Sequence, residues 1–180
     1  TNLCSTIATD FVSKNVDLIM ANATPALQAA ASATLDIPVL GTSVTEYGVA
    51  LGIKDFDGLV GGNISGTSDL APLTEQAQMM IDTLSLKNGD KVGLLYCSAE
   101  PNSVYQVEKV KEYLDGKGIK ATLYTFADSS DVSLVAQKAA DEANAELAQA
   151  QAEYETASTE AMDVVREQAR AEVTQSMDAV

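Results

Sequence analysis

The sequence predicts an α/β protein with parallel strands, followed by one long helix at the carboxyl end. Short aliphatic runs alternate with segments of helical spacing as far as residue 126, which is typical of a parallel sheet covered by helices. From Ser129 onward the chain contains neither Gly nor Pro and is rich in Ala, Glu and Gln, so we expect a continuous helix there.

Each expected strand is a short apolar run bounded by polar residues, Gly or Pro. The five strands are expected near residues 16–22, 37–41, 63–67, 91–97 and 119–126. Helices are expected after Thr24 and Pro25, briefly within the glycine-rich stretch 41–66, over 73–84, over 103–114 and from Val132.

The composition limits the partners and the chemistry. A formal net charge of −15 repels phosphate backbones and argues against nucleic acid as a partner. The chain has no His, which removes the commonest general base and metal ligand and the usual Ser-His-Asp triad. Cys4 and Cys97 stand far apart in sequence and are expected as free thiols. We therefore predict a protein that is not an enzyme, with no metal and no cofactor.

Two junctions between a strand and a helix resemble one another. Thr24-Pro25 follows the first strand, and Glu100-Pro101-Asn102-Ser103 follows the fourth. We expect a hydroxyl or amide side chain to cap each helix, with Thr24 as the first cap. Helix ends at the carboxyl rim of a parallel sheet suit a carboxylate or phosphate, although capped junctions also occur without any ligand.

The last stretch of the chain has a different character from the rest. Residues 141–180 hold ten acidic and two basic residues, which suggests a boundary near Ala143. Apolar residues recur there at spacings of three and four, at Leu147, Ala150, Tyr154, Ala157, Ala161 and Val164. This spacing fits either a thin coiled-coil stripe or a solvated helix, and both interpretations stay open.

Four segments, in order, resemble a known family. Asp17 to Ala26 is similar to its DLI-x-A-x-x-TPA signature, and Asp36-Ile37-Pro38-Val39 with Thr42 to Thr45 continues the likeness. Gly62 to Asp69 is similar to its GN-[IV]-[ST]-G-x-SD segment, and Val92 to Tyr96 with Glu100 to Ser103 is similar to the start of its second lobe. The family is that of ABC-transporter substrate-binding proteins, including the tryptophan/tyrosine type, and the likeness covers residues 2–142.

This resemblance implies a periplasmic-binding-protein fold of type I, with a ligand in the cleft between two lobes that close by a hinge. We expect partial lobes over residues 1–69 and 70–142 and a tail over 143–180, with the first three strands in one sheet and the last two in another. The implied ligand is an amino acid or similar small carboxylate, with aromatic amino acids among the candidates. The implied partner is an ABC permease, and the implied location is extracytoplasmic.

Carried over by position, the resemblance gives a set of ligand-binding residues. Lobe one would hold a ligand carboxylate with Thr24 and the backbone of Pro25 and Ala26, beside a wall lined by Thr42 and Ser43. Lobe two would contribute Asn102 and Ser103, and Asp69 would lie near the crossing between lobes. On charge grounds alone, Glu100 or Asp69 is the expected partner of an ammonium group.

The chain also departs from the family pattern. It lacks the family's first strand and helix, supplies one of three crossings between lobes, and shows no likeness after Ala143, so we expect a partial chain without a signal segment. The alternative function is a scaffold whose carboxyl-terminal helix mediates self-association.

Overall fold

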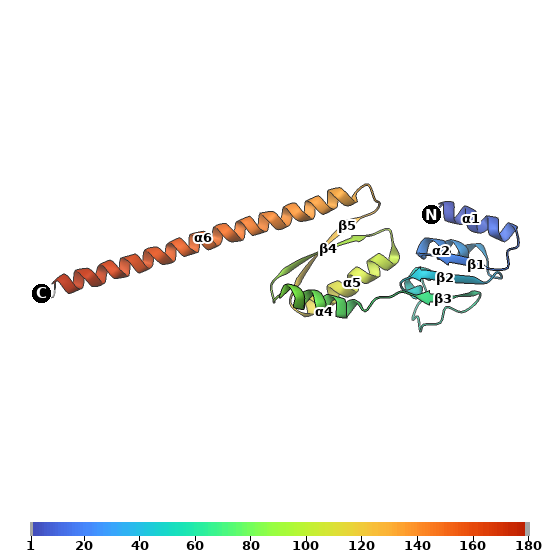
Figure 1. Cartoon of the computed structure of the whole chain (residues 1–180), viewed down its shortest axis with the longest axis horizontal. Coiled ribbons are helices and arrows are strands. Elements are labelled where there is room, and N and C mark those ends of the chain that lie inside the picture. Colours follow the sequence, from blue (N-terminus) through green and yellow to red (C-terminus); the bar gives the residue numbers. More distant parts are fainter. Residues whose placement is uncertain (1, 179–180) are drawn as a thin grey trace. The chain divides into compact units, whose positions relative to one another are not determined.

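A computed structural model describes residues 2–178, with side chains described over residues 3–170. The chain forms two compact units, Thr1–Val132 and Ser133–Val180. The first unit contains all the strands of the described residues, and the second consists of helix (Figure 1).

The strands form two separate parallel sheets, one in each lobe of the first unit. One sheet has the order β1-β2-β3, and the other pairs β4 with β5. The strands are β1 (Ile19–Asn22), β2 (Val39–Val44), β3 (Ile64–Ser68), β4 (Lys91–Cys97) and β5 (Lys120–Phe126). This grouping confirms the expected fold class and places the crossing between lobes after Ser68.

Five helices belong to the first unit. They are α1 (Asn2–Ser13), α2 (Thr24–Ala33), α3 (Tyr47–Leu51), α4 (Leu73–Leu84) and α5 (Pro101–Gly116). All except α1 lie where the sequence predicts a helix. Helix α1 is rich in β-branched residues, which are weak helix formers, and it is held by packing on α2, where Ala8 is buried.

The core of lobe one lies between its sheet and α2. Leu27 of α2 packs with Ile19, Val39 and Val44, and all four side chains are buried. Burying side chains of this size stabilises the lobe by roughly 1.5–3 kcal/mol each relative to exposure. This packing fixes the first residue of α2 at the carboxyl end of β1.

The ring of Tyr47 lies against two glycines in adjacent strands. Gly41 of β2 is paired in register with Gly66 of β3, and a Cβ atom at either position would lie 2.4 Å or less from the Tyr47 hydroxyl oxygen. That hydroxyl donates a hydrogen bond to the Thr67 carbonyl oxygen at 3.2 Å. The glycine pair therefore determines where α3 begins.

Lobe two is smaller and packs α5 against its two strands. Leu114 and Ile119 are the most deeply buried apolar residues here, at 0% and 2% exposure. Tyr113 of α5 donates a hydrogen bond to the Gln78 side chain of α4 at 2.8 Å. Each sheet also leaves apolar side chains exposed, with Met20 and Leu40 in lobe one and Leu95 and Leu123 in lobe two.

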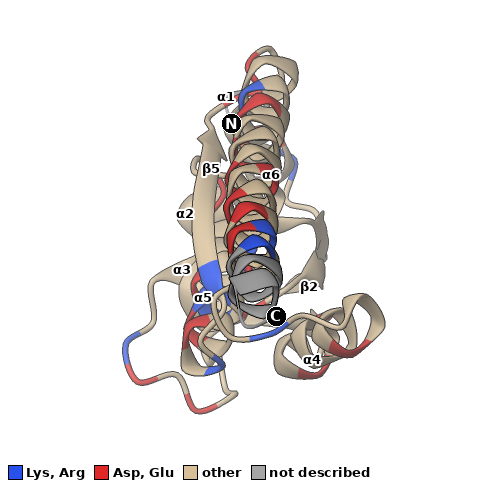
Figure 2. Cartoon of the chain, turned by 90° about the vertical axis from the view of Figure 1, so that its left-hand side faces the viewer, with Lys and Arg blue, Asp and Glu red and all other residues tan. Residues whose placement is uncertain are grey.

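The second unit is formed by the helix α6 (Val132–Asp178), which begins at Val132 as the sequence predicts. It runs without a break through residue 143, and every side chain from residue 140 to 170 is exposed, including Leu147, Tyr154 and Val165. Figure 2 shows acidic residues spread along it. The boundaries at residues 69/70 and 142/143 stay predictions. None of the helices that the structure describes combines the length and the apolar character needed to cross a membrane.

The packing of the Tyr47 ring against Gly41 and Gly66 leads to a test of stability. Gly41→Ala should lower the free energy of unfolding by about 1–3 kcal/mol, because the new methyl group overlaps the Tyr47 ring. Urea denaturation followed by circular dichroism measures this change. In a Tyr47→Phe background the loss should be smaller, since the nearest clashing atom is gone. Gly116→Ala is the control, because a Cβ atom there meets nothing within 4 Å. An equal loss of stability from both substitutions would contradict the close packing of Tyr47 on Gly41.

Candidate functional site

The two lobes meet where α2 and α5 begin. The Asn102 side chain of α5 donates from Nδ2 to the Thr24 hydroxyl oxygen at 3.1 Å, and its Oδ1 accepts from the Glu46 backbone N–H at 3.2 Å. Asn102 is 1% exposed and Thr24 6% exposed. Three residues from separate segments are thus brought together. Two of them, Thr24 and Asn102, were predicted to bind the ligand.

Helix α2 begins in a strained turn that no side chain caps. The cap position is Ala23, which has φ 73° and ψ 160°, a region that residues other than Gly rarely adopt. Thr24 is therefore not the cap, as the sequence had suggested, but the first residue of the helix. The turn directs the Thr24 hydroxyl toward α5, and the first N–H groups of α2 lack the side-chain acceptor that a cap would supply.

Helix α5 has a carboxylate cap instead of the expected hydroxyl or amide cap. The Glu100 carboxylate accepts from the backbone N–H of Asn102 at 3.1 Å and from that of Ser103 at 2.5 Å. An acidic group is favourable at the positive end of the helix dipole. This capping leaves the Asn102 side chain free to reach lobe one.

Sequence reasoning missed Glu46, which caps α3 in the same way. Its carboxylate accepts from the backbone N–H of Gly48 at 3.0 Å and of Val49 at 2.5 Å. The signal was present, since Glu46 follows a strand and bonds the residues two and three positions later, as Glu100 does. Asn102 is therefore hydrogen-bonded to both capping residues, to the Glu46 backbone N–H and to the Glu100 carboxylate, and to Thr24 at the uncapped start of α2.

The other predicted residues lie at varying distances from this junction. Thr42 and Ser43 fall inside β2 and not after it, and the Thr42 carbonyl accepts from the Ala23 N–H at 2.9 Å. The Ser103 hydroxyl accepts from the Cys97 N–H at 3.3 Å, so it points toward its own sheet. Asp69 is exposed in the segment that joins the lobes.

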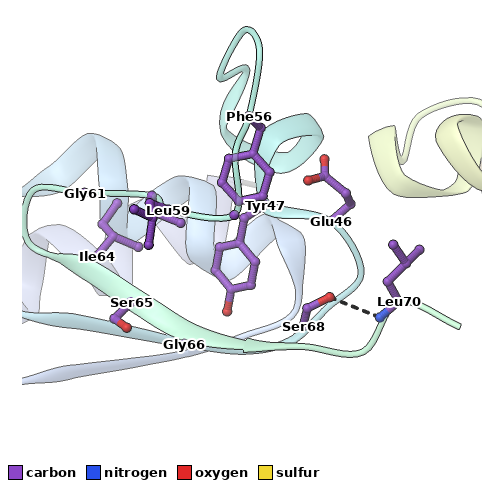
Figure 3. A pocket seen from close by; sticks show the side chains of 12 residues that line it. Glu46, Tyr47, Phe56, Leu59, Gly61, Ile64, Ser65, Gly66, Ser68 and Leu70 are labelled. Atoms are coloured by element: carbon purple, nitrogen blue, oxygen red, sulfur yellow. Dashed lines mark hydrogen bonds between the residues drawn. The ribbon is translucent and has the colours of Figure 1, made fainter.

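Next to the junction is a cavity of about 480 Å³ (Figure 3). Its walls combine apolar side chains with a few polar groups, from Glu46, Tyr47, Phe56, Leu59, Ile64 and Ser68 among others. The described residues that line it include none of the nine predicted site residues. Glu46 connects the two places, because its side chain lines the cavity and its backbone N–H bonds Asn102.

Tyr47 lines this cavity, and the pKa of its phenol is raised above the ordinary value. Burial raises the pKa of its phenol, and the nearby Asp69 carboxylate raises it further. The phenol is therefore neutral at physiological pH and acts as a hydrogen-bond donor to the Thr67 carbonyl oxygen.

Comparisons with known proteins bear on the family and the fold of this chain. Residues 1–178 match the model of a family described as ABC transporter substrate binding protein. The match extends through α6, further than the likeness to residue 142 that the sequence motifs indicate. A tyrosine-binding protein of Clostridioides difficile (strain R20291) is 37% identical over 127 residues, which is 71% of this chain and 36% of that protein.

Two solved structures share the fold at similar identity. The ABC domain in complex with L-Trp from Streptococcus pneumoniae is 32% identical with a TM-score of 0.65, covering 73% of this chain and 45% of that one. A conserved domain protein from Vibrio cholerae is also 32% identical, with a TM-score of 0.70 over 78% of this chain and 47% of that one. The chain thus spans less than half the length of these relatives.

The carboxylate cap of α5 can be tested by substitution. Glu100→Ala should lower the free energy of unfolding by about 0.5–2 kcal/mol, because two backbone N–H groups lose their acceptor. Glu100→Gln should lose less, since one side-chain oxygen remains. Glu108→Ala, at an exposed position of the same helix, is the matched control and should change stability by less than about 0.5 kcal/mol. Equal effects at both positions in urea denaturation would rule out the cap.

Proposed function

We propose a function from the premise that this chain belongs to the ABC transporter substrate-binding protein family, a family of binding proteins and not of enzymes. The function is the binding of an amino acid, or of a similar small carboxylate, between the two lobes. The observation that carries it is that Asn102 joins the uncapped start of α2 to two residues, Glu46 and Glu100, whose carboxylates cap the neighbouring helices.

The lobe-one groups suit the carboxylate of such a ligand. The backbone N–H of Glu46 is a hydrogen-bond donor, and so are those of Thr24 and Ala26 at the start of α2, whereas Pro25 has no N–H. The Thr24 hydroxyl can also act as a donor. The positive end of the α2 dipole adds about 0.3–1 kcal/mol toward an anion. The strained turn at Ala23 supports this role, because strain of this kind is concentrated at functional sites.

The acidic groups suit the ammonium of the same ligand. Glu46 and Glu100 each bind backbone N–H groups, and a carboxylate has further lone pairs for a cation. Asp69 stays a third candidate, and Thr42, Ser43 and Ser103 complete the proposed set of contacts. A group of donors beside a group of carboxylates complements a zwitterion, and this favours an amino acid over a simple carboxylate.

The cavity beside Glu46 is the proposed place for the ligand's side chain. Its volume of about 480 Å³ lies within the roughly 300–1,000 Å³ of small-molecule sites, and Phe56, Leu59 and Ile64 give it apolar walls. The names of two relatives mention tyrosine and L-Trp. These features together make L-tyrosine and L-tryptophan the first ligands to test.

Partner and location follow from the family as proposals. Substrate-binding proteins of ABC transporters are typically extracytoplasmic or membrane-associated. We place this chain in the periplasm or on the outer face of the cytoplasmic membrane, where it would deliver its ligand to an ABC permease. We propose no nucleic-acid partner, because the net charge of −15 opposes one.

The second candidate function is self-association through α6. The exposed stripe that includes Leu147, Tyr154 and Val164 favours it. The other members of the stripe are alanines, whose burial releases little apolar area. Residues 141–180 carry ten acids and two bases, so copies of this helix repel one another. The binding function is therefore the better supported of the two.

Thr24 provides the direct test of binding. Titration calorimetry of the full chain with a panel of amino acids should detect L-tyrosine or L-tryptophan. Thr24→Ala should weaken the affinity by roughly 10- to 150-fold, because a hydrogen bond to a charged carboxylate contributes about 1.5–3 kcal/mol. Thr34→Ala, in the segment after α2, is the control with the same change of side chain. Undiminished binding by Thr24→Ala would remove Thr24 from the site.

Sedimentation separates the two candidate functions. The full chain should sediment as a monomer at micromolar concentration, and deletion of residues 144–180 should leave this unchanged. A sedimenting mass that rises with concentration in the full chain, but not after residues 144–180 are deleted, would favour self-association through α6 instead.

A further inference from the structure

The orientation of the Asn102 carboxamide is set by a group that can only donate. Its Oδ1 accepts from the Glu46 backbone N–H at 3.2 Å, and a backbone N–H has no acceptor atom. The carboxamide oxygen therefore faces Glu46, and the NH₂ group faces Thr24, to whose hydroxyl oxygen it donates at 3.1 Å. Asn102 is 1% exposed, so bulk water does not compete for these bonds.

The Thr24 hydroxyl is left with its proton unused. A hydroxyl has one proton to donate and lone pairs that accept, and the NH₂ group of Asn102 occupies a lone pair. Within the described part of the chain, the Thr24 hydroxyl takes part in no other hydrogen bond. Thr24 is 6% exposed, and a buried donor without an acceptor is unfavourable. The hydroxyl is thus suited to a ligand that brings an acceptor.

We propose that Asn102 is a positioning residue, which fixes the Thr24 hydroxyl as a donor and thereby selects a ligand that presents a carboxylate there. The selection of the carboxylate rests on the proposed function, whereas the orientation of the hydroxyl does not. The donor character of the Glu46 N–H passes through the carboxamide to the hydroxyl, so Glu46 supports the ligand carboxylate indirectly. Hydrogen bonds in such a chain polarise and strengthen one another.

The three groups come from both lobes, which ties this selection to lobe closure. Asn102 lies at the start of α5, where the Glu100 carboxylate accepts from its backbone N–H at 3.1 Å. Thr24 and Glu46 belong to lobe one. The hydroxyl is therefore oriented only when the start of α5 lies against lobe one. Closure of the lobes and binding of a carboxylate favour each other in this arrangement.

The orientation can be measured without any ligand, by NMR of the ¹⁵N-labelled full chain. Thr24→Val keeps a side chain of similar shape and removes the hydroxyl. It should move a side-chain NH₂ proton resonance of Asn102 upfield, because that proton loses its acceptor, while the Glu46 amide proton keeps its own partner and shifts less. Thr24→Ser keeps the hydroxyl and should stay close to the parent chain. Asn102 resonances unchanged by Thr24→Val would overturn the orientation.

Asn102→Asp reverses the polarity of the hydroxyl with little change of shape. Both oxygens of the new carboxylate accept, so the Thr24 hydroxyl turns to donate to one of them and is lost to a ligand. The bonds between the lobes remain, so a purely structural role predicts little change. By calorimetry, L-tyrosine should bind roughly 10- to 150-fold more weakly, whereas tyramine, which lacks the carboxylate, should bind no more weakly than to the parent. Asn144→Asp, exposed on α6, is the matched control and should match the parent for both.

A double-mutant cycle separates the hydroxyl from the added charge. In a Thr24→Val background there is no hydroxyl to reverse, so Asn102→Asp should weaken L-tyrosine binding by clearly less than it does in the parent chain. Equal losses in the two backgrounds, or undiminished binding by a folded Asn102→Asp chain, would overturn the proposal. If L-tyrosine and L-tryptophan bind no form of the chain, the proposed function fails, while the Asn102 resonances still decide the orientation.

Discussion

The structure around the junction depends on a close approach of backbone to aromatic ring. Gly41 and Gly66 lie side by side in adjacent strands, and the space that their missing side chains leave is filled by Tyr47. The ring holds α3 against the sheet, and the N-terminal end of α3 presents the Glu46 N–H to Asn102. A feature inside lobe one thus determines a contact with lobe two.

This dependence joins stability and function in one set of residues. The Tyr47 ring is part of the hydrophobic core of lobe one and also lines the cavity. The Glu46 carboxylate accepts hydrogen bonds from two backbone N–H groups at the start of α3, and it is a negative charge near the junction. Under the proposed function a substitution here would act on folding and on binding together, so the two effects need separate measurements.

The sequence predicted the regular elements of this fold well and the junction only in part. Strand β4 is found at Lys91–Cys97, within the range expected from its apolar run, because apolar periodicity reports burial directly. Thr24 and Asn102 were both singled out, yet their bond to each other spans 78 positions of sequence. Local patterns do not contain such a contact. The caps were misassigned because a Thr before Pro usually caps a helix, whereas here the strained turn at Ala23 moves it inside.

The exposed apolar side chains of the two sheets have a consequence for the behaviour of the protein in solution. Met20 and Leu40 are paired in register on one face of their sheet, whereas Leu95 and Leu123 lie on opposite faces of theirs. Exposed apolar side chains of this kind promote association between molecules. A net charge of −15 opposes that association through long-range repulsion, and residues 141–180 supply eight of those charges. The acidic helix therefore acts as a source of colloidal stability for the lobes. This protection fades in acid as the pH approaches the isoelectric point of about 4.1, where the same sheet faces become adhesive.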